Sequence, residues 1–415
     1  RMLRDPLGYP SGLRADHGPV FTLRLLPYRA GIVCATDPAT VREVLTDNER
    51  FAAGDAAALL GPIVGEHSLI LTPPPQHLRN RRLLLPAFHG DSIARWEDRV
   101  RTLAEASVPA LANAGPAAAR PWAQRLTLDV ILRVVFGLDR PERVDAFRRA
   151  LDALMAPAML ALLFAPAVTR RDLGRRSPGG VLAGRRAAVD ALLHEEIAAR
   201  RAEDGTDGRD DVLSVLLGAR DEQDRGFTDA ELRDELMGLV VAGHETTATA
   251  LAWTLHLLAH HPDVRDELRD EIRAGSGELL KATIKESMRL RPPVFDAIRI
   301  ARADTELGGR PVPAGAYVSA LFSTMHLDPD LWPDPTRFRP HRHLEGKPAP
   351  YALTPFGGGV RRCLGAALAN LELEVVLREV LRRAVPEPAG PPEAPRLQSV
   401  TIVPARGGRV TLRTG

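Results

Sequence analysis

Cysteine is scarce in this chain of 415 residues, which contains two, Cys34 and Cys363. Two cysteines cannot build the disulfide framework on which small secreted proteins depend, so we predict a reducing, cytoplasmic compartment. Cys34 lies in the apolar, strand-like run AGIVCAT and is predicted to be an inert core residue. No CxxC pair or neighbouring cysteine–histidine set accompanies Cys363, which argues against a zinc site.

Long apolar segments and a dominant charge are also missing. No stretch approaches 18 uncharged apolar residues, and the first residues carry no signal-peptide core, so we expect a soluble protein without a membrane anchor. The formal net charge is +2, so no overall basic field favours nucleic acid as a partner. A hydrophobic share of 45% and a charged share of 26% are those of an ordinary globular protein.

Hydrophobic periodicity predicts a mainly α protein with small β-sheets (α+β). Residues 19–36 are predicted as two strands around a Pro-Tyr turn, followed by a helix behind the cap Asp37. From about Pro75 to Arg291 apolar residues recur at helical spacing. SPGGVLAG and EDGTDGRDD are predicted as loops. With no repeat and no linker, we expect a single domain over residues 1–415.

The longest predicted helix runs from about Thr228 to His260. It begins with Thr-Asp-Ala-Glu, the spacing of a capping box, and ends before Pro262. Because its middle is apolar on nearly all sides, we expect it to cross the centre of the protein. Beyond Arg291 the pattern changes to strands and turns, and a last helix follows Cys363.

The segment TPFGGGVRRCLGAALA places Cys363 at the start of that last helix. There the helix dipole and the backbone N–H groups stabilise a thiolate, which is a soft metal ligand. Phe356 offers a ring, Arg361 a guanidinium for a carboxylate, and Gly365 room for a flat group. A haem needs an axial ligand, an apolar face and partners for two propionates. A nucleophilic cysteine with a distant base, or an inert one, stays open at this point.

Phe356, Gly359, Arg361, Cys363 and Gly365 match F-x-x-G-x-R-x-C-x-G, and the chain therefore resembles the cytochromes P450. The resemblance implies the P450 fold, with haem b between the central long helix and the helix of the cysteine loop. It makes Cys363 the iron ligand and the other residues of the loop haem contacts.

The central helix contains AGHETT, which resembles the family's oxygen-binding motif A/G-G-x-D/E-T. The resemblance implies that Ala242 and Gly243 border the haem, that Thr246 holds the oxygen being activated and that Glu245 relays protons to it. Thr246 can also bond to the carbonyl four residues earlier and open the helix locally. The alternative is a Gly/Thr kink in a core helix with Glu245 in a salt bridge.

Glu286 and Arg289, three apart in KESMRLRPP, coincide with the family's E-x-x-R motif. The resemblance implies that they join Arg342, from FRPHRHL, to brace the cysteine loop. In that segment His343 stands where the family has an aromatic residue and His341 where it has an acid. The connection between the helix starting at Pro262 and KESMRL is shorter than is usual for the family.

Propionate partners are also implied by the resemblance. His77 and Arg81, four apart on one helix face, match the family's H-x-x-x-R motif, and Arg299 matches an arginine on the strand after the E-x-x-R helix. Arg361 of the cysteine loop is the fourth candidate. For each of them alone, a solvated side chain is the alternative.

The pair Glu245–Thr246 favours reductive activation of O2, with electrons from an external ferredoxin or flavodoxin and its NAD(P)H reductase, because the chain has no flavin, iron–sulfur or dinucleotide motif. The donor is expected to dock on the cysteine side, near Arg79, Arg82 and Arg362. The family's substrate-facing segments are apolar here and favour a terpenoid, fatty acyl or polyketide-like substrate. They correspond to residues 51–71, 156–173, 239–242, 294–298 and 399–402.

The leading hypothesis is a monooxygenase that hydroxylates or epoxidises a lipophilic small molecule, with secondary metabolism as the expected setting. A peroxygenase or oxidative coupling enzyme of the same fold is the second hypothesis, and a thiolate-haem sensor or ligand carrier is the non-enzymatic one. Asp296 is expected to be a solvent-facing strand carboxylate rather than an anchor for a polar or cationic group.

Overall fold

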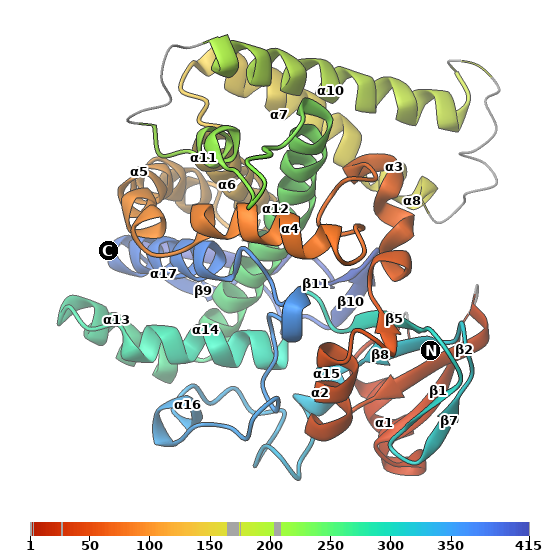
Figure 1. The fold of residues 1–415 in the computed structure, drawn as a ribbon. Coiled ribbons are helices and arrows are strands. Elements are labelled where there is room, and N and C mark those ends of the chain that lie inside the picture. Colours follow the sequence, from red (N-terminus) through yellow and green to blue (C-terminus); the bar gives the residue numbers. More distant parts are fainter. Residues whose placement is uncertain are drawn as a thin grey trace. The chain divides into compact units, whose positions relative to one another are not determined.

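The computed structural model describes residues 2, 4–25, 28–163, 174, 176–202 and 209–414. Helices dominate and the strands are short, as the periodicity predicts (Figure 1). The helices are α1 (Gly8–His17), α2 (Pro38–Thr46), α3 (Gly61–Val64), α4 (Gln76–Leu84), α5 (Asp91–Asn113), α6 (Ala119–Val130), α7 (Pro141–Met155), α8 (Pro157–Leu162), α10 (Pro178–Ala202), α11 (Val212–Gly218), α12 (Asp229–His260), α13 (Pro262–Arg273), α14 (Glu278–Leu290), α15 (Phe322–Met325), α16 (Arg342–Glu345) and α17 (Ala366–Arg383).

The strands form four small sheets. They are β1 (Val20–Leu25), β2 (Tyr28–Ala35), β3 (Phe51–Ala52), β4 (Ala117–Ala118), β5 (Ala297–Ala301), β6 (Thr305–Leu307), β7 (Arg310–Val312), β8 (Tyr317–Ala320), β9 (Ala384–Pro388), β10 (Pro395–Gln398), β11 (Thr401–Pro404) and β12 (Arg409–Thr414). The largest sheet has the order β1-β2-β8-β5-β3, and the others are β4-β12-β9, β10-β11 and β6-β7.

The chain groups into two compact units. The first comprises residues 1–56, 100–127 and 245–415, and the second comprises residues 57–99 and 128–244. The first unit therefore holds the largest sheet, the second half of α12 and the cysteine loop, and the second unit holds α4, α7, α10 and the first half of α12.

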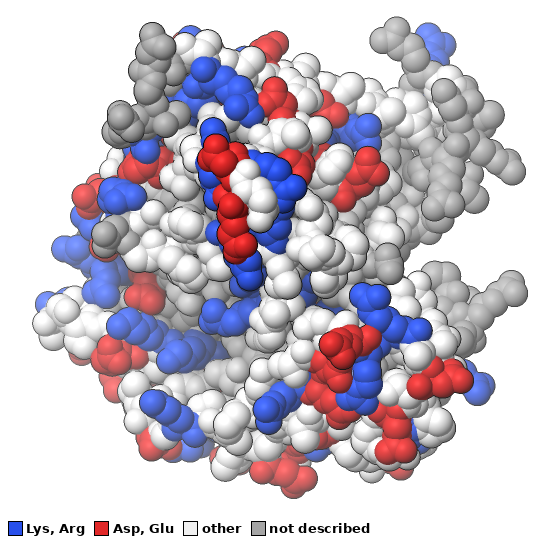
Figure 2. Space-filling model, in the orientation of Figure 1, with Lys and Arg blue, Asp and Glu red and all other residues white. Residues whose placement is uncertain are grey.

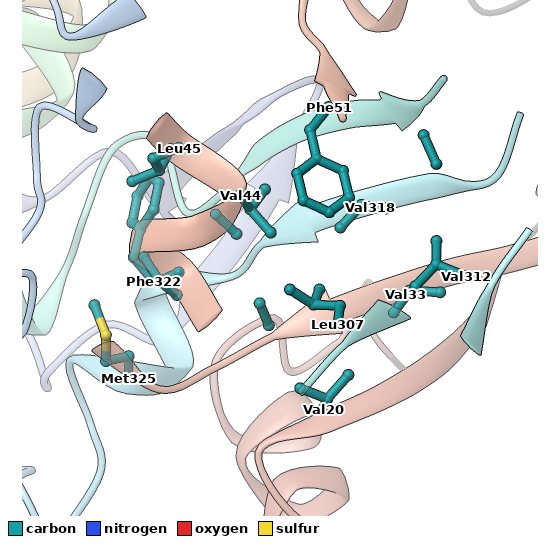
Figure 3. Packing of buried hydrophobic residues seen from close by; sticks show 14 residues of the cluster. Val20, Val33, Val44, Leu45, Phe51, Leu307, Val312, Val318, Phe322 and Met325 are labelled. Carbon is teal, nitrogen blue, oxygen red and sulfur yellow. The ribbon is translucent and has the colours of Figure 1, made fainter. Parts of the chain in front are cut away.

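One face of the largest sheet carries α2 and an apolar core. Asp37 caps α2 as predicted, since its carboxylate accepts hydrogen bonds from the N–H groups of Ala39 and Thr40 at 3.0 and 3.2 Å. Figure 3 shows Val44 and Leu45 of α2 beside side chains of the sheet and of α15. The opposite face of the sheet carries a second cluster, which includes Cys34. Cys34 is buried, in agreement with its predicted core position.

Helix α12 matches the predicted central helix almost to the residue. The capping box at its start is complete, because the Thr228 N–H donates to Glu231 at 2.9 Å and the Glu231 N–H donates to the Thr228 hydroxyl at 3.2 Å. In the first unit, the Trp253 indole donates to the carbonyl of Ile402 at 2.9 Å and ties the helix to β11. Among the described helices, α12 included, none is long and apolar enough to cross a membrane.

One predicted loop is wrong. SPGGVLAG belongs largely to α10, which begins at Pro178. The Ser177 hydroxyl accepts a hydrogen bond from the Gly180 N–H at 3.1 Å, and a proline at the first helical position suits a helix start, so these two signals outweigh the two glycines. The Pro-Tyr turn falls partly on residues 26 and 27, and most of the EDGTDGRDD loop on residues 203–208, which lie outside the described part of the chain.

The short connection between α13 and α14 is a turn formed by residues 274–277. The carboxylate of Glu271 in α13 accepts hydrogen bonds from the N–H groups of Leu279 and Leu280 at 2.7 and 3.1 Å, and so caps the start of α14. The cap satisfies backbone N–H groups in the first turn of α14, which have no partner within the helix.

In the second unit, Glu235 of α12 is a buried carboxyl that ties two segments to the helix. It accepts hydrogen bonds from the Leu69 N–H at 3.0 Å and from the Asn80 amide at 2.9 Å. Burial raises the pKa of Glu235 to about 7 against these two hydrogen bonds, and the charges of Asp234 and Glu231 raise it further. The folded protein therefore binds a proton here that the unfolded chain releases near pH 4.5.

We expect the free energy of unfolding to fall as the pH rises from about 4.5 to 7, with Glu235 responsible for at most about 3 kcal/mol of that fall. The measurement is urea unfolding between pH 5 and 8, with Glu235→Gln expected to flatten the profile. Asp229→Asn, which changes an exposed acid of the same helix, serves as the control. Equal slopes in the wild type and in Glu235→Gln would contradict the assignment.

Candidate functional site

The cysteine loop leads from Thr354 into α17. The Cys363 N–H donates to the carbonyl of Phe356 at 2.9 Å, so the loop closes on itself just before the helix. Helix α17 begins at Ala366, three residues later than the sequence predicts, and the side chain of Cys363 is exposed. The sulfur therefore lies near the N-terminal end of α17, where helical N–H groups and the dipole favour a thiolate.

Gly359 permits the loop to pack against α2. Its φ of +63° is a left-handed conformation, and a Cβ at this position would collide with the carbonyl oxygen of Leu45. A glycine is required here for both reasons. The loop is thus held against the C-terminal turn of α2, on the side of the sheet shown in Figure 3.

The structure brings Glu286, Arg289 and Arg342 together in the first unit. Arg289 donates to both carboxylate oxygens of Glu286, at 2.8 and 2.9 Å, and neither side chain is exposed. Arg342 donates to the same carboxylate at 3.1 Å. His343 also contacts it, at 2.9 Å, in the position where the family's aromatic residue was expected. The sequence analysis did not predict this contact of His343 with Glu286. The position of His343 directly after Arg342 could have indicated it.

His326 links this cluster to the cysteine loop. Its carbonyl accepts a hydrogen bond from Arg289 at 2.6 Å, and its ring accepts one from the Thr354 N–H at 3.1 Å. Burial lowers the pKa of His326 to about 3, and the charge of Arg289 lowers it further, so the ring stays neutral and can accept. Nothing in the sequence around His326 indicated this contact.

Arg299 of β5 is buried and only partly satisfied. It donates to the carbonyl of Ile298 at 2.9 Å, while its Nε has no hydrogen-bond partner among the described residues. Burial lowers the pKa of Arg299 to about 10. In the sheet Arg299 pairs with Val318, which belongs to the core on the face that carries α2. A buried guanidinium with an unsatisfied donor fits an anionic group such as a haem propionate.

Helix α12 is mostly buried, but some residues in its middle are accessible to solvent. Ala242 is exposed and Gly243 and Thr246 are half-buried, although Val240 and Thr247 are buried. Ala242 and Thr246 are four residues apart and so share one helix face. The helix is continuous from Asp229 to His260, so the predicted local opening does not break it. An accessible face with small side chains fits a flat cofactor.

Glu245 does not stand alone beside Thr246. Its carboxylate accepts hydrogen bonds from the Arg120 guanidinium, with Nε at 3.1 Å, and from the Gln124 amide at 2.7 Å, both on α6. The Thr249 hydroxyl donates to it at 3.2 Å. The salt bridge that the sequence left open as an alternative is therefore present.

The other predicted positions are spread over the chain. Arg361 lies half-buried in the short helical turn η4 (Gly359–Arg361) of the cysteine loop. Gly365 is the N-cap of α17, and a Cβ at this position would meet no atom of the described residues within 4 Å. His77, which is buried, and Arg81 lie four residues apart on α4 in the second unit. They therefore share one face of that helix, as the H-x-x-x-R pattern requires.

One expectation about a charged side chain needs correction. Asp296 precedes β5 rather than lying in a strand, and it is half-buried. Burial raises the pKa of Asp296 to about 6, which a solvent-facing carboxylate would not show. Arg79, which is expected near the docking surface of the electron donor, donates to Asp221 at 2.7 Å and ion-pairs with Glu231 at 3.4 Å inside the second unit.

The comparisons with known proteins agree with this site. A family model described as cytochrome P450 matches residues 5–407. Cytochrome P450 135B1 of Mycobacterium tuberculosis is 38% identical over 422 residues, which cover 99% of this chain and 88% of that protein. The solved structure of cyanobacterial CYP120A1 with bound retinoic acid has a TM-score of 0.83 at 25% identity and covers 98% of this chain and 94% of the other. That of CYP102L1 has a TM-score of 0.87 at 22% identity, covers 99% and 98%, and shows the fold alone.

The predicted fold class and the predicted family are thus confirmed. An exposed cysteine before α17, a buried arginine with an unsatisfied donor and an accessible face of α12 are what a thiolate-bound haem requires of its protein. Together with the match over nearly the whole sequence, they lead to one conclusion: the chain belongs to the cytochrome P450 family and is a haem-thiolate monooxygenase that uses O2 and a redox partner.

Proposed function

We propose that this P450 inserts one atom of O2 into a lipophilic small molecule, by hydroxylation or epoxidation, with haem b as its cofactor. The observation that carries the proposal is the pair Glu245–Thr246 on α12, with Thr246 on the accessible face and Glu245 held one residue away by α6. Haem b is favoured because the sequence has no C-x-x-C-H motif for covalent attachment.

Each residue contributes a definite physical effect. Cys363 would provide the thiolate ligand, and Arg299, Arg361, His77 and Arg81 would bind the propionates. The haem iron supplies the activation of O2. The Thr246 hydroxyl would hold a proton for the reacting centre, and Glu245 would carry protons from the α6 side to that hydroxyl after leaving Arg120.

The electron donor is proposed to be an acidic ferredoxin or flavodoxin with an NAD(P)H reductase. Arg362, next to Cys363, is exposed, and Arg82 is exposed and pairs only with the exposed Glu222 among the described residues. Figure 2 shows basic and acidic side chains interspersed on the visible face, so the attraction has to be local. Such a complex would be weak and sensitive to salt.

The substrate is proposed to be terpenoid, fatty acyl or polyketide-like, and a role in secondary metabolism is compatible with that. The segments that carry this proposal are apolar, although most of residues 156–173 lies outside the described chain. We also propose that the two units form one domain over residues 1–415, because one family model matches residues 5–407 and α5, α6 and α12 each pass through both units. The two cysteines outside any disulfide favour the cytoplasm.

The test compares turnover with NADH, ferredoxin and reductase against turnover with peroxide alone. Glu245→Gln is expected to lower reductase-driven turnover about 100-fold, because one proton-transfer group is lost. Thr246→Ala is expected to leak electrons into free peroxide. Peroxide-driven turnover, which takes no protons from solvent because peroxide carries both, is the internal control. If peroxide alone drove the wild type as well as the reductase system and Glu245→Gln had no effect, the peroxygenase hypothesis would replace this one.

A further inference from the structure

Asp296 is a half-buried carboxyl that the proposed chemistry leaves unused. Its Oδ2 accepts a hydrogen bond from the Ser319 hydroxyl at 2.8 Å. Ser319 of β8 pairs in register with Cys34 of β2, so this contact lies on the sheet face that carries the Cys34 cluster. That face is opposite to the one on which α2 and the cysteine loop pack. The carboxyl therefore lies on the side of the sheet opposite to α2.

The charge of Asp296 is poorly compensated. Among the described residues no cation lies within ion-pair distance of it, and Arg299 acts on it only through space. Burial raises the pKa of Asp296 to about 6, so most molecules are ionised at neutral pH. Arg299 has an unsatisfied Nε and is suited to a propionate. Once an anion neutralises Arg299, Asp296 loses its one nearby positive charge.

The stretch around Asp296 keeps accessible surface. Residues 294–298 are all half-buried, in contrast to the buried strand β8 beside them. Val294 and Ala297 pack against the core cluster on the α2 face of the sheet, and Phe295 packs against the cluster that contains Cys34. These apolar side chains are therefore held in place by packing. A half-buried carboxyl with apolar neighbours is suited to a charged group attached to a hydrocarbon.

We propose that Asp296, oriented by Ser319, binds the cationic nitrogen of the substrate, and that the substrate of this P450 is an amphiphilic amine whose hydrocarbon part is oxidised. The inference rests on the proposed function and narrows its substrate class. A half-buried carboxylate without a cation gains most from a ligand that supplies one, whereas a hydroxyl group would leave its charge uncompensated. Asp296 would hold the amine at the sheet, and the hydrocarbon part would extend to the reacting centre, where it is oxidised.

The test is calorimetric titration of the haem-loaded protein with two ligands of equal chain length, decyltrimethylammonium and 1-decanol. The quaternary ammonium is chosen because its nitrogen cannot coordinate iron. We expect the wild type to bind the ammonium at least about tenfold more tightly than the alcohol. Asp296→Asn should lose this tenfold preference and keep its affinity for the alcohol. Glu306→Gln, which removes an exposed carboxylate of β6, should keep the preference.

Ser319→Ala is the second variant. It removes the hydrogen bond to Asp296 but keeps the charge, so the preference should fall only two- to threefold, and it serves as the test if Asp296→Asn does not fold. Equal affinity of the wild type for both ligands, or an unchanged preference in Asp296→Asn, overturns the inference. The carbon monoxide spectrum of each reduced variant is recorded in parallel. Loss of the sulfur-ligation band in the wild type would overturn the proposed function instead, and the calorimetry would still report on Asp296.

Discussion

Cys363→Ser is expected to abolish the spectroscopic signature of sulfur ligation. The purified wild type, reduced and treated with carbon monoxide, should show the absorbance band diagnostic of a thiolate ligand, and the variant should not. A serine hydroxyl is a weaker electron donor and stays protonated at neutral pH, so it cannot replace the thiolate. We also expect turnover to fall by about 100-fold or more, the scale on which the loss of one electrostatic group at a reacting centre acts.

Cys34→Ala is the matched control, because it removes the only other sulfur of a cysteine in the chain. Burial raises the pKa of the Cys34 thiol, aided by the charge of Asp296, so it stays neutral and is a poor ligand. The band should be intact in Cys34→Ala. A wild type without the band, or a Cys363→Ser variant whose pigment is unchanged, would remove the basis of the assignment.

Glu286→Gln is expected to prevent accumulation of the folded, haem-loaded protein. The substitution leaves the guanidinium groups of Arg289 and Arg342 buried without their carboxylate, and breaking a buried pair in this way costs about 3–5 kcal/mol. That is a large share of the about 5–15 kcal/mol that stabilises a typical protein. Because Arg289 also supports His326, which holds Thr354, the cysteine loop should loosen as well. The measurements are urea unfolding and the ratio of haem to protein.

The control lies on the same helix. Glu278 pairs with Lys281 at the same three-residue spacing, but both side chains are exposed, so Glu278→Gln should leave unfolding nearly unchanged. The pH dependence gives a further check. Burial alone would raise the pKa of Glu286, but hydrogen bonds from Arg289 and His343 outweigh it and lower the pKa to about 2. Its contribution to stability is therefore present above about pH 4.5 and is lost as the pH falls through 2. Equal unfolding of Glu286→Gln and Glu278→Gln would contradict the bracing role.

The sequence predicted helix starts correctly where the capping interactions involve residues close together in the chain. The cap of α2 at Asp37 and the capping box of α12 at Thr228 depend on residues within four positions of one another, and both are present. The failure at residues 177–184 is of the same kind, since the cap and the proline at Ser177–Pro178 were available but were outweighed by two glycines. The start of α17 was misplaced because the loop before it closes through the Phe356 carbonyl, a contact that periodicity does not report.

The sequence by itself determined the family and the motifs of the cysteine loop and of α12, because these are written as residue types at fixed short spacings. Only the tertiary structure decided what surrounds them: Arg120 on Glu245, His326 between Arg289 and Thr354, and Ser319 on Asp296. These partners are 23 to 125 residues apart in the chain. Whether such side chains meet, and which pKa values shift as a result, depends on how the whole chain packs and on how much water that packing excludes.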